Sequence, residues 1–334
     1  MGPTCCGCAH LLADAQSPAS ETMSRVAVCI CTCDRAALLA RVLDVLAEIE
    51  LHGLSPSDLL LVVVDNLGDG RARTVCAARA SRLPMEIRFL EEPRPGISFA
   101  RNRVTAEARA WGADLVAFLD DDDVPRPDWL WRLIAKQQET GADLVFGFWC
   151  LPSDLNLPSW LRNTRYFRPP ARDDRNRFGL PAWAGTYNVL MTRRVLDALA
   201  PVEGPFREEF AFCGGEDSDL FIRARDAGFA HACAHDSVVV RAWEPHRLTL
   251  GGVLRRGFLR GGSRVHIAKA HLSSDQVRAL AWSSWRKLGK SCVRLLFGWN
   301  RTRLVGGLLT LSHALGEIHA WAGMRYDYYL RRRT

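Results

Sequence analysis

Four consecutive aspartates, Asp120 to Asp123, directly follow a run of apolar residues at 115–119. The apolar run predicts a strand that is buried on both faces, and Pro125 and Pro127 end that strand and favour a turn. Adjacent carboxylates repel one another, and an unpaired charge at the end of a buried strand is unfavourable. A hard divalent cation, Mg²⁺ or Mn²⁺, binds oxygen ligands of this kind and can also hold a diphosphate. The run therefore predicts a cation site, with a solvated acidic turn as the alternative.

A second acidic group lies much later in the chain, where Gly214 and Gly215 precede Glu216, Asp217 and Asp219. The glycines allow the backbone to approach a neighbouring element closely at the start of a predicted helix. Carboxylates in the first turn of a helix are ordinary capping chemistry, which is a sufficient explanation for Asp219. Capping explains the adjacent Glu216–Asp217 pair less well, so these two residues are candidates for acid–base chemistry.

The first half of the chain predicts strands and helices in alternation. With helices between them, strands are expected at 25–32, 58–65, 86–90 and 115–120. Nearly all-apolar strands in this order are typical of an α/β fold with an open, Rossmann-like, mostly parallel sheet flanked by helices. In such sheets, ligands bind beyond the carboxyl ends of the strands. Thr32 and Asp34, Asp65 and the aspartate run all lie at strand ends, so we expect them to converge on one crevice.

The chain beyond residue 140 predicts a continuation of the sheet that a long loop interrupts. A strand is expected within 141–150 and a strand followed by a helix within 183–199, whereas 153–180 has little periodicity and predicts a loop that could cover the substrate. No G-x-G-x-x-G follows the first strand and no G-x-x-x-x-G-K-[ST] occurs, which argues against a dehydrogenase. Asp65 could still accept a hydrogen bond from a base or ribose, unless it only forms a turn with Asn66.

The C-terminal part of the chain is strongly basic. Residues 251–334 contain sixteen Lys or Arg against three Asp or Glu, while the remainder is mildly acidic. A basic tail that contains tryptophans indicates a negatively charged partner, for which anionic lipid and nucleic acid are the two candidates.

This tail is also expected to be helical over about 263–330. Its apolar residues recur at helical spacing and form one stripe, made of Leu304, Leu308, Leu311, Leu315, Ile318 and Trp321. His313, Glu317 and His319 interrupt the stripe, which argues against a helix that spans a membrane. Two roles stay open: a helix lying on the inner membrane leaflet, and a tail packed on the catalytic body or on a second subunit.

Eleven cysteines occur, but their spacing predicts neither disulfides nor a zinc site. Cys29, Cys31 and Cys33 alternate along the first strand, so we expect them to share a face and to pack as small apolar residues. No secretory signal is recognised, and the expected compartment is the reducing cytoplasm. Residues 1–22 lack periodicity and predict a disordered leader, with Met23 as an alternative start.

Five short motifs follow one another along the chain: TCDR at 32–35, VVDN at 63–66, ARN at 100–102, FLDDDD at 118–123 and GGEDSDL at 214–220. Their order and spacing resemble glycosyltransferase family 2, whose members have the GT-A fold. The segment 243–262 is similar to the end of the catalytic domain in bacterial exopolysaccharide members of the succinoglycan type. The resemblance implies a GT-A catalytic domain over 23–262, followed by a basic helical extension over 263–334.

The resemblance implies a metal-dependent, inverting transfer of a sugar from a nucleotide-diphosphate donor to a hydroxyl acceptor. Asp120 and Asp122 would hold Mg²⁺ or Mn²⁺, and Asp217 would be the catalytic base with Glu216 beside it. The resemblance implies that Thr32, Asp34 and Asp65 contact the nucleoside. Further candidates for nucleotide-sugar binding are Arg35, Arg101, Asn102, Asp120, Asp121, Arg255 and Arg256, with surface ion pairing as the alternative for Arg101. Two features depart from the family pattern: Asp34 stands where Asn is more usual, and four aspartates leave two registers open for D-x-D.

The acceptor is expected to be a glycan or a lipid-linked sugar, and Trp183 and Asn188 are candidates for contacting it. Trp149 and Trp160 could also stack on sugar faces, with core or loop packing as the alternative for each tryptophan. His246 is either a third metal ligand or a loop residue. We expect no nucleic-acid partner.

Two competing interpretations remain at this point. A sugar-phosphate nucleotidyltransferase would need a Gly-rich basic loop after the first strand, which the sequence lacks. A non-catalytic carbohydrate-binding protein would leave both acidic groups without a role.

Overall fold

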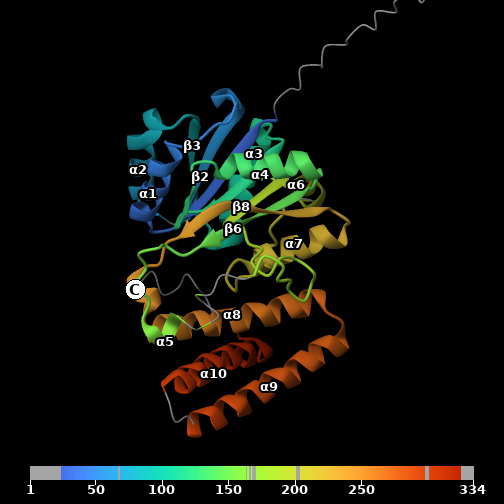
Figure 1. The fold of residues 1–334 in the computed structure, drawn as a ribbon. Helices are drawn as coiled ribbons and strands as arrows, with labels where there is room; N and C mark the ends of the chain where they lie inside the picture. Colours follow the sequence, from blue (N-terminus) through green and yellow to red (C-terminus); the bar gives the residue numbers. More distant parts are fainter. Residues whose placement is uncertain are drawn as a thin grey trace, which may run out of the picture.

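An eight-stranded sheet, with helices on both of its faces, forms one half of the structure, which is a computed structural model (Figure 1). The structure describes residues 24–324 except 67, 163, 165–166, 168–170, 201–203 and 298–300. The leader predicted at 1–22 and the alternative start at Met23 lie outside the described residues.

The strands lie in the order β3-β2-β1-β4-β7-β6-β8-β5. β3, β2, β1 and β4 are parallel, β7 is antiparallel to β4 and β6, β8 is parallel to β6, and β5 is antiparallel to β8. Their bounds are β1 (Val26–Thr32), β2 (Leu59–Asn66), β3 (Glu86–Glu92), β4 (Leu115–Asp120), β5 (Asp123–Pro125), β6 (Leu144–Cys150), β7 (Asn188–Thr192) and β8 (His231–Arg241). The predicted α/β class is confirmed, and its parallel half consists of the four strands expected first in the chain.

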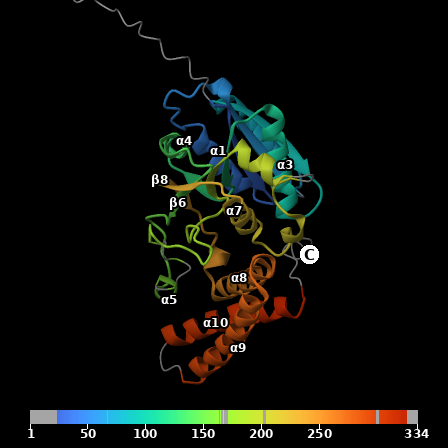
Figure 2. The ribbon, with the colours of Figure 1, turned by 90° about the vertical axis from the view of Figure 1, so that its right-hand side faces the viewer.

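Helices cover both faces of the sheet (Figures 1 and 2). One face packs against α1 (Ala36–Leu46), α2 (Arg71–Arg79) and α4 (Trp129–Thr140), and the other against α3 (Ile97–Trp111), α6 (Arg193–Leu199) and α7 (Glu216–Asp226). Val28 and Ile30 of β1 belong to the first core, whereas Ala27 and Cys29 belong to the second. The strands are apolar throughout because successive side chains enter opposite cores, each of which excludes water.

Two long elements were not predicted from the sequence, α4 and β8. The prolines before α4 end the preceding strand, but the helix then buries Trp129, Leu130, Leu133 and Ile134 at helical spacing. β8 mixes histidine and aspartate with valines, and its register against β6 shifts at Gly147, so it lacks the alternation of a regular strand.

Several short helices lie in the connections. The predicted loop at 153–180 contains α5 (Ser159–Arg162). Single 3₁₀ turns are found at Pro56–Asp58, Ala80–Arg82, Glu208–Phe210 and Pro245–Leu248.

Three long helices, α8 (Leu250–His271), α9 (Ser274–Leu296) and α10 (Arg301–Trp321), form the C-terminal part at one end of the molecule (Figures 1 and 2). α10 packs against both α8 and α9. α8 and α10 approach closely, since a Cβ on Gly261 would meet the carbonyl of His313 and a Cβ on Gly316 would meet that of Phe258. The domain boundary expected at 262 falls within α8, which therefore belongs to both parts.

The apolar stripe predicted for the tail is not the buried side of α10. Leu304 and Leu315 are exposed, whereas Val305, Leu309 and Glu317 are buried. His313, expected to interrupt the apolar side, is buried as well.

Glu317 is buried because the neighbouring helices neutralise it. Its Oε1 lies 2.7 Å from Arg264 of α8, 2.6 Å from Lys287 of α9 and 3.3 Å from His313. Burial raises the pKa of Glu317, but hydrogen bonds from His313, Lys287 and Ser284 outweigh it and lower the pKa to about 2. A single carboxylate thus ties the three helices together.

Among the described residues, no helix combines the length and the apolar character needed to cross a bilayer.

Candidate functional site

The register of the parallel strands brings three strand ends to one edge of the sheet. Thr32 lies beside Asp65 in the β1–β2 pair, and Cys31 lies beside Asp120 in the β1–β4 pair. Ligands of open α/β sheets bind beyond this edge. The convergence expected for Thr32, Asp65 and the aspartate run is therefore present.

Asp121 links the end of β4 to the start of α1. Thr32 Oγ1 donates a hydrogen bond to one carboxylate oxygen of Asp121 at 2.7 Å, and Arg35 donates to the other at 2.9 Å. Burial raises the pKa of Asp121 to about 6, because the opposing effects of Arg35 and Thr32 do not offset it and Asp122 adds to it. The carboxylate is held in place, yet its charge is only partly compensated.

Asp120, Asp122 and Asp123 form a cluster in which one oxygen of each carboxylate lies within 4.8 Å of the others. Asp123 is fully buried and forms a bidentate ion pair with Arg241, whose Nη2 and Nε lie 3.0 and 3.2 Å from its two carboxylate oxygens. The side chain of Asp120 is 40% exposed, so it faces solvent. Asp120 and Asp122 both belong to this cluster and Asp121 does not, so the arrangement is compatible with Asp120 and Asp122 as the D-x-D pair.

Arg241 and Arg247 are the site residues that the sequence analysis missed. Arg247 lies 2.9 Å from Asp122, which Arg35 also approaches at 3.3 Å. Arg241 is at the end of β8 and Arg247 is in the following 3₁₀ turn, and neither element was predicted. For Arg247 the segment 243–262, which carries part of the family resemblance, was the available signal, whereas Arg241 lies just before that segment.

Arg101 of α3 connects the two acidic groups. Its guanidinium pairs with Glu216 and also lies 3.7 Å from Asp120. Burial and the neighbouring Asp217 raise the pKa of Glu216, although Arg101 acts in the opposite direction. Residues that are far apart in the sequence therefore share one buried arginine, and the two clusters form a single site.

The glycine pair lets α7 begin against α8. Gly214 and Gly215 have φ values of 70° and 99°, and a Cβ on either would lie 3.0 Å from side chains of α8. Asp217, in the first turn of α7, is half-buried and accepts a hydrogen bond from the backbone of Ser218 at 2.6 Å. Asp219 is fully buried and pairs with Arg223 at 2.8 Å, so its role is structural.

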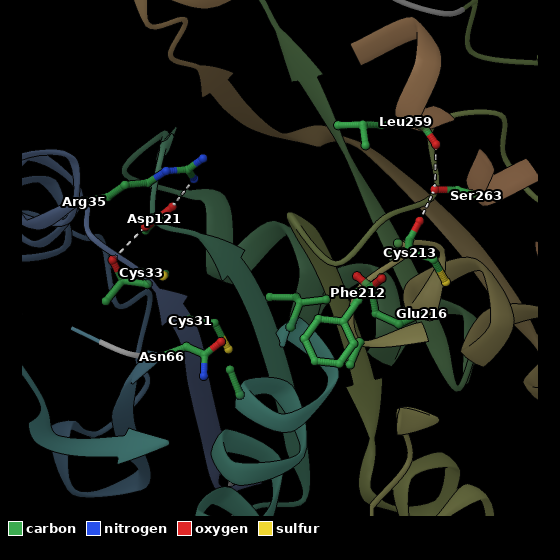
Figure 3. A pocket seen from close by; sticks show the side chains of 15 residues that line it. Cys31, Cys33, Arg35, Asn66, Asp121, Phe212, Cys213, Glu216, Leu259 and Ser263 are labelled. Carbon is green, nitrogen blue, oxygen red and sulfur yellow. Dashed lines mark hydrogen bonds and ion pairs between the residues drawn. The ribbon is translucent and has the colours of Figure 1, made fainter. Parts of the chain in front are cut away.

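A cavity of about 260 Å³ separates the end of β1 from the loop that leads into α7 (Figure 3). Arg35 and Asp121 line one side, and Phe212 and Glu216 line the other. α8 adds Leu259 and Ser263, and Ser263 donates a hydrogen bond to the carbonyl of Cys213 at 2.6 Å. The cavity offers apolar walls and a few directed polar groups, as small-molecule sites commonly do.

Two further predicted aspartates lie at the same edge of the sheet: Asp65 is near the end of β2, and Asp34 follows β1. Asp65 is buried, its Oδ1 has no hydrogen-bond partner among the described residues, and burial together with Glu91, Asp69 and Asp34 raises its pKa to about 6. An orphaned buried oxygen of this kind fits a ligand donor. Asp34 is exposed, has a left-handed backbone (φ 55°) and pairs with Arg71.

The nucleotide-binding role predicted for Asn102 is not supported. Its amide donates to the carbonyl of Phe206 and accepts from the nitrogen of the same residue, at 2.8 and 2.9 Å. Both functions of the side chain are used to hold the loop before α7.

Trp183 and Asn188, the predicted acceptor contacts, both have buried side chains that bond within the protein. Trp183 donates to the carbonyl of Gly147 at 3.0 Å. Asn188 accepts from Trp129 at 2.7 Å and donates to two backbone carbonyls. Trp149 is buried too, so core packing accounts for it.

Other predicted residues lie away from the cavity. Arg256 stacks on the ring of Trp243, with its guanidinium carbon 4.6 Å from the ring centroid. Arg255 is an exposed residue of α8. His246 is exposed and is not part of the carboxylate cluster.

The donor set fits a divalent cation. Three carboxylates with closely spaced oxygens are the ligands that Mg²⁺ and Mn²⁺ prefer, and the side chain of Asp120 is partly exposed to solvent. Within the described part of the chain this is the group of acidic, histidine or cysteine residues that meets the spacing of a metal site.

Comparison with known sequences places these features in a family. The family described as "Glycosyltransferase like family 2" matches residues 24–259. The succinoglycan biosynthesis protein ExoM of Rhizobium meliloti (strain 1021) is 29% identical over 222 residues, which cover 64% of this chain and 67% of that protein. The validoxylamine A glucosyltransferase of Streptomyces hygroscopicus subsp. limoneus is 27% identical over 257 residues, which cover 69% of this chain and 54% of that protein.

Solved structures show the same fold. A mannosyltransferase from Pyrobaculum calidifontis, in complex with GDP-Man and Mn²⁺, aligns with a TM-score of 0.56 at 16% identity over 89% of this chain and 87% of that one. TarS residues 1–349 of S. aureus, in complex with UDP-GlcNAc, aligns with a TM-score of 0.51 at 14% identity over 91% and 93%. The predicted GT-A fold is confirmed.

Proposed function

The chain belongs to glycosyltransferase family 2 and is a glycosyltransferase, and from this premise we propose that it is metal-dependent and inverting. In this proposal a sugar moves from a nucleotide-diphosphate donor to the hydroxyl group of an acceptor. The ion pair that joins Arg101 to Glu216, together with its 3.7 Å approach to Asp120, is the observation that carries the proposal. It holds the candidate leaving-group site and the candidate base at one centre.

The cavity beside β1 is the proposed nucleotide pocket. Thr32 and Arg35 line it, and both are fixed by hydrogen bonds to Asp121. The free oxygen of Asp65 would accept a hydrogen bond from the base or ribose, which would satisfy a buried polar atom.

Asp120 and Asp122 are the proposed holders of Mg²⁺ or Mn²⁺, which when bound supplies Lewis-acid stabilisation of the leaving diphosphate. In the structure Asp122 is paired with Arg35 and Arg247. These arginines keep the carboxylate oriented, and they lie where they could contact phosphate oxygens of a bound donor.

Asp217 is the proposed general base. It is half-buried, its neighbour Glu216 is engaged by Arg101, and one carboxylate oxygen accepts from the Ser218 backbone. The carboxylate would take the proton from the acceptor hydroxyl as the new bond forms. With one base opposite the leaving group, the displacement is direct and the anomeric configuration inverts.

The acceptor is proposed to be a glycan or a lipid-linked sugar in polysaccharide or glycoconjugate synthesis. The likeness to a succinoglycan biosynthesis protein supports this class.

We further propose a catalytic part over 23–262, and a basic helical extension over 263–334 that faces an anionic membrane surface on its cytoplasmic side.

The two competing interpretations are weaker. Family membership favours sugar transfer over nucleotidyl transfer. A binding protein without catalysis would not require a buried arginine that joins two acidic groups.

A panel of UDP- and GDP-sugars, with glycan and lipid-linked acceptors and Mn²⁺, tests the proposal by the release of nucleoside diphosphate. We expect release to need both the acceptor and the cation, and NMR of the product to show inversion. Asp122→Ala should weaken Mn²⁺ and donor binding together, while the exposed Asp236→Asn on β8 should bind both normally. Release that withstands chelation, or retention at the anomeric carbon, would contradict the proposal.

A further inference from the structure

The outer face of α9 presents large apolar side chains to solvent. The exposed fractions are 73% for Trp282 and 78% for Leu296, and Trp285, Val293 and Phe297 are each more than half exposed. Trp282 and Trp285 are three positions apart, Val293 follows eight positions later, and Leu296 and Phe297 lie three and four positions beyond Val293, so at 100° per residue all five point to one side of the helix. We call these five residues the α9 face, and no described residue covers it.

The side of α9 that faces α10 carries mostly small or polar side chains. Leu280, Ser284 and Ser291 are buried there. Lys287 pairs with Glu317 at 2.6 Å, and Ser284 accepts a hydrogen bond from Trp321 at 3.3 Å. A helix that served only to complete the fold would bury its largest apolar side chains, and α9 does the reverse.

Positive charge accompanies the α9 face. Arg278, Arg286, Lys290 and Arg294 are all exposed on this helix, and its acidic residue, Asp275, lies in the first turn. An apolar stripe containing tryptophans, bordered by Arg and Lys, is the composition that lies in the interface of an anionic bilayer. We propose that the α9 face docks the protein on an anionic lipid bilayer.

A second copy of the chain is the other candidate for covering the α9 face. A two-fold interface would place the face against itself, because such interfaces use the same patch on both subunits. Basic residues of one copy (Arg286, Lys290 and Arg294) would then lie near basic residues of the other, and like charges at close range repel. An anionic surface fits the same residues without this conflict.

Docking through α9 would orient the whole molecule. α10 lies between α8 and α9, and α8 contributes Leu259 and Ser263 to the candidate nucleotide cavity. The cavity and the bilayer would then be separated by the helical layer. With this spacing, the cavity would reach a lipid-linked acceptor whose sugar projects away from the bilayer. It would not reach a hydroxyl group that lies at the membrane surface.

The inference refines the membrane contact proposed above, and vesicle flotation of the full chain tests it independently of sugar transfer. We expect flotation with phosphatidylglycerol vesicles, weakened by salt, and little with phosphatidylcholine vesicles. The double variant Trp282→Gln/Trp285→Gln should lower partitioning at least about tenfold. Neutralising Arg286, Lys290 and Arg294 with Gln should lower it roughly 100-fold at low salt, since each basic residue contributes about fivefold.

Leu250→Gln is the matched control, because Leu250 is an exposed apolar residue of α8 outside the α9 face. It should float like the wild type, and all variants should keep the wild-type circular dichroism and nucleotide-sugar binding. Equal flotation of the tryptophan variant and the wild type would overturn the proposal. So would a concentration-dependent dimer that the tryptophan variant abolishes, since the α9 face would then bind a second copy.

Discussion

The sheet edge and the helical extension both bury carboxylates beside cationic groups, with opposite electrostatic results. Asp121 is held by Arg35, yet burial keeps its pKa raised at about 6. Glu317 is equally buried, but its cationic neighbours lower its pKa to about 2. The difference lies in the ratio of charges. At the sheet edge, four aspartates and Glu216 share four arginines (Arg35, Arg101, Arg241 and Arg247), whereas the single carboxylate of Glu317 has two cations and a histidine.

This contrast separates the candidate binding site from a structural ion pair. A carboxylate whose neighbouring cations lower its pKa contributes to stability. A carboxylate whose pKa stays raised despite its cationic neighbours favours the binding of a further cation, such as a metal that carries phosphate. The two regions also differ on their surfaces. In the described chain, all large apolar side chains that are exposed lie between Leu250 and Met324. The distinctive feature of the sheet half is therefore the edge where the aspartates lie. The helical part is distinguished by its buried ion pairs and by the apolar side chains that it exposes to solvent.

The largest effect on stability is expected from Glu317→Gln. Removing the charge leaves Arg264 and Lys287 without their carboxylate, and because both are partly exposed we expect a loss of about 3 kcal/mol, the lower end for a buried pair. Urea unfolding measures this loss. Glu139→Gln, in an exposed pair with Lys136, is the control and should change stability by less than about 0.5 kcal/mol.

Because of Glu317, we expect the free energy of unfolding to fall at acidic pH. The folded-state pKa of Glu317 lies below the usual 4.5, so its ionised form stabilises the fold above about pH 4.5. This contribution, about 3 kcal/mol, is lost as the pH falls from about 4.5 through 2. Stability curves of the wild type and Glu317→Gln against pH should converge over that range. Parallel curves would show that Glu317 is not the titrating group.

Close packing of α8 and α10 predicts a smaller loss for Gly316→Ala. The added methyl group would meet the carbonyl of Phe258, and overpacking of this kind costs about 1–3 kcal/mol. Gly306→Ala in the same helix has open space and should gain up to about 1 kcal/mol from helix propensity. Thermal unfolding distinguishes the two, and equal shifts would argue against the close helix contact.

The smallest effect is expected from Asp121→Asn, measured without divalent cations near pH 7.5. Since the folded-state pKa of Asp121 is raised, its ionised form opposes folding as the pH rises from about 4 through 6, and removing the charge offsets the lost hydrogen bonding. The net change should stay below about 1 kcal/mol. A loss as large as that of Glu317→Gln would remove the electrostatic distinction between the two regions.

The sheet edge was largely predictable because local patterns determine it. Apolar strands that end in Thr32, in Asp65–Asn66 and in Asp120 indicate both a parallel α/β sheet and the edge at which the polar residues meet. The partners of these residues were not predictable, because Arg241 and Arg247 reach the aspartates only after β8 has joined the sheet. Arg101 was named as a candidate, but its contact with Glu216 depends on how α7 packs.

The helical extension was harder to predict. Its helical character was evident, but the choice of buried side depended on charges from other helices. Leu304 and Leu315 look like core residues by spacing, yet the ion pairs of Glu317 turn the opposite side of α10 inward. Hydrophobic periodicity cannot register a buried charge that is neutralised by residues remote in sequence.

The rate of sugar transfer by Asp217→Asn, at saturating donor and Mn²⁺, tests most directly whether the two acidic groups serve one reaction. We expect the rate to fall by about 10²–10⁴-fold, with donor and Mn²⁺ binding unchanged, because only proton removal from the acceptor is lost. Asp226→Asn, at the exposed end of the same helix, should transfer at the wild-type rate. Wild-type transfer by Asp217→Asn would contradict the account.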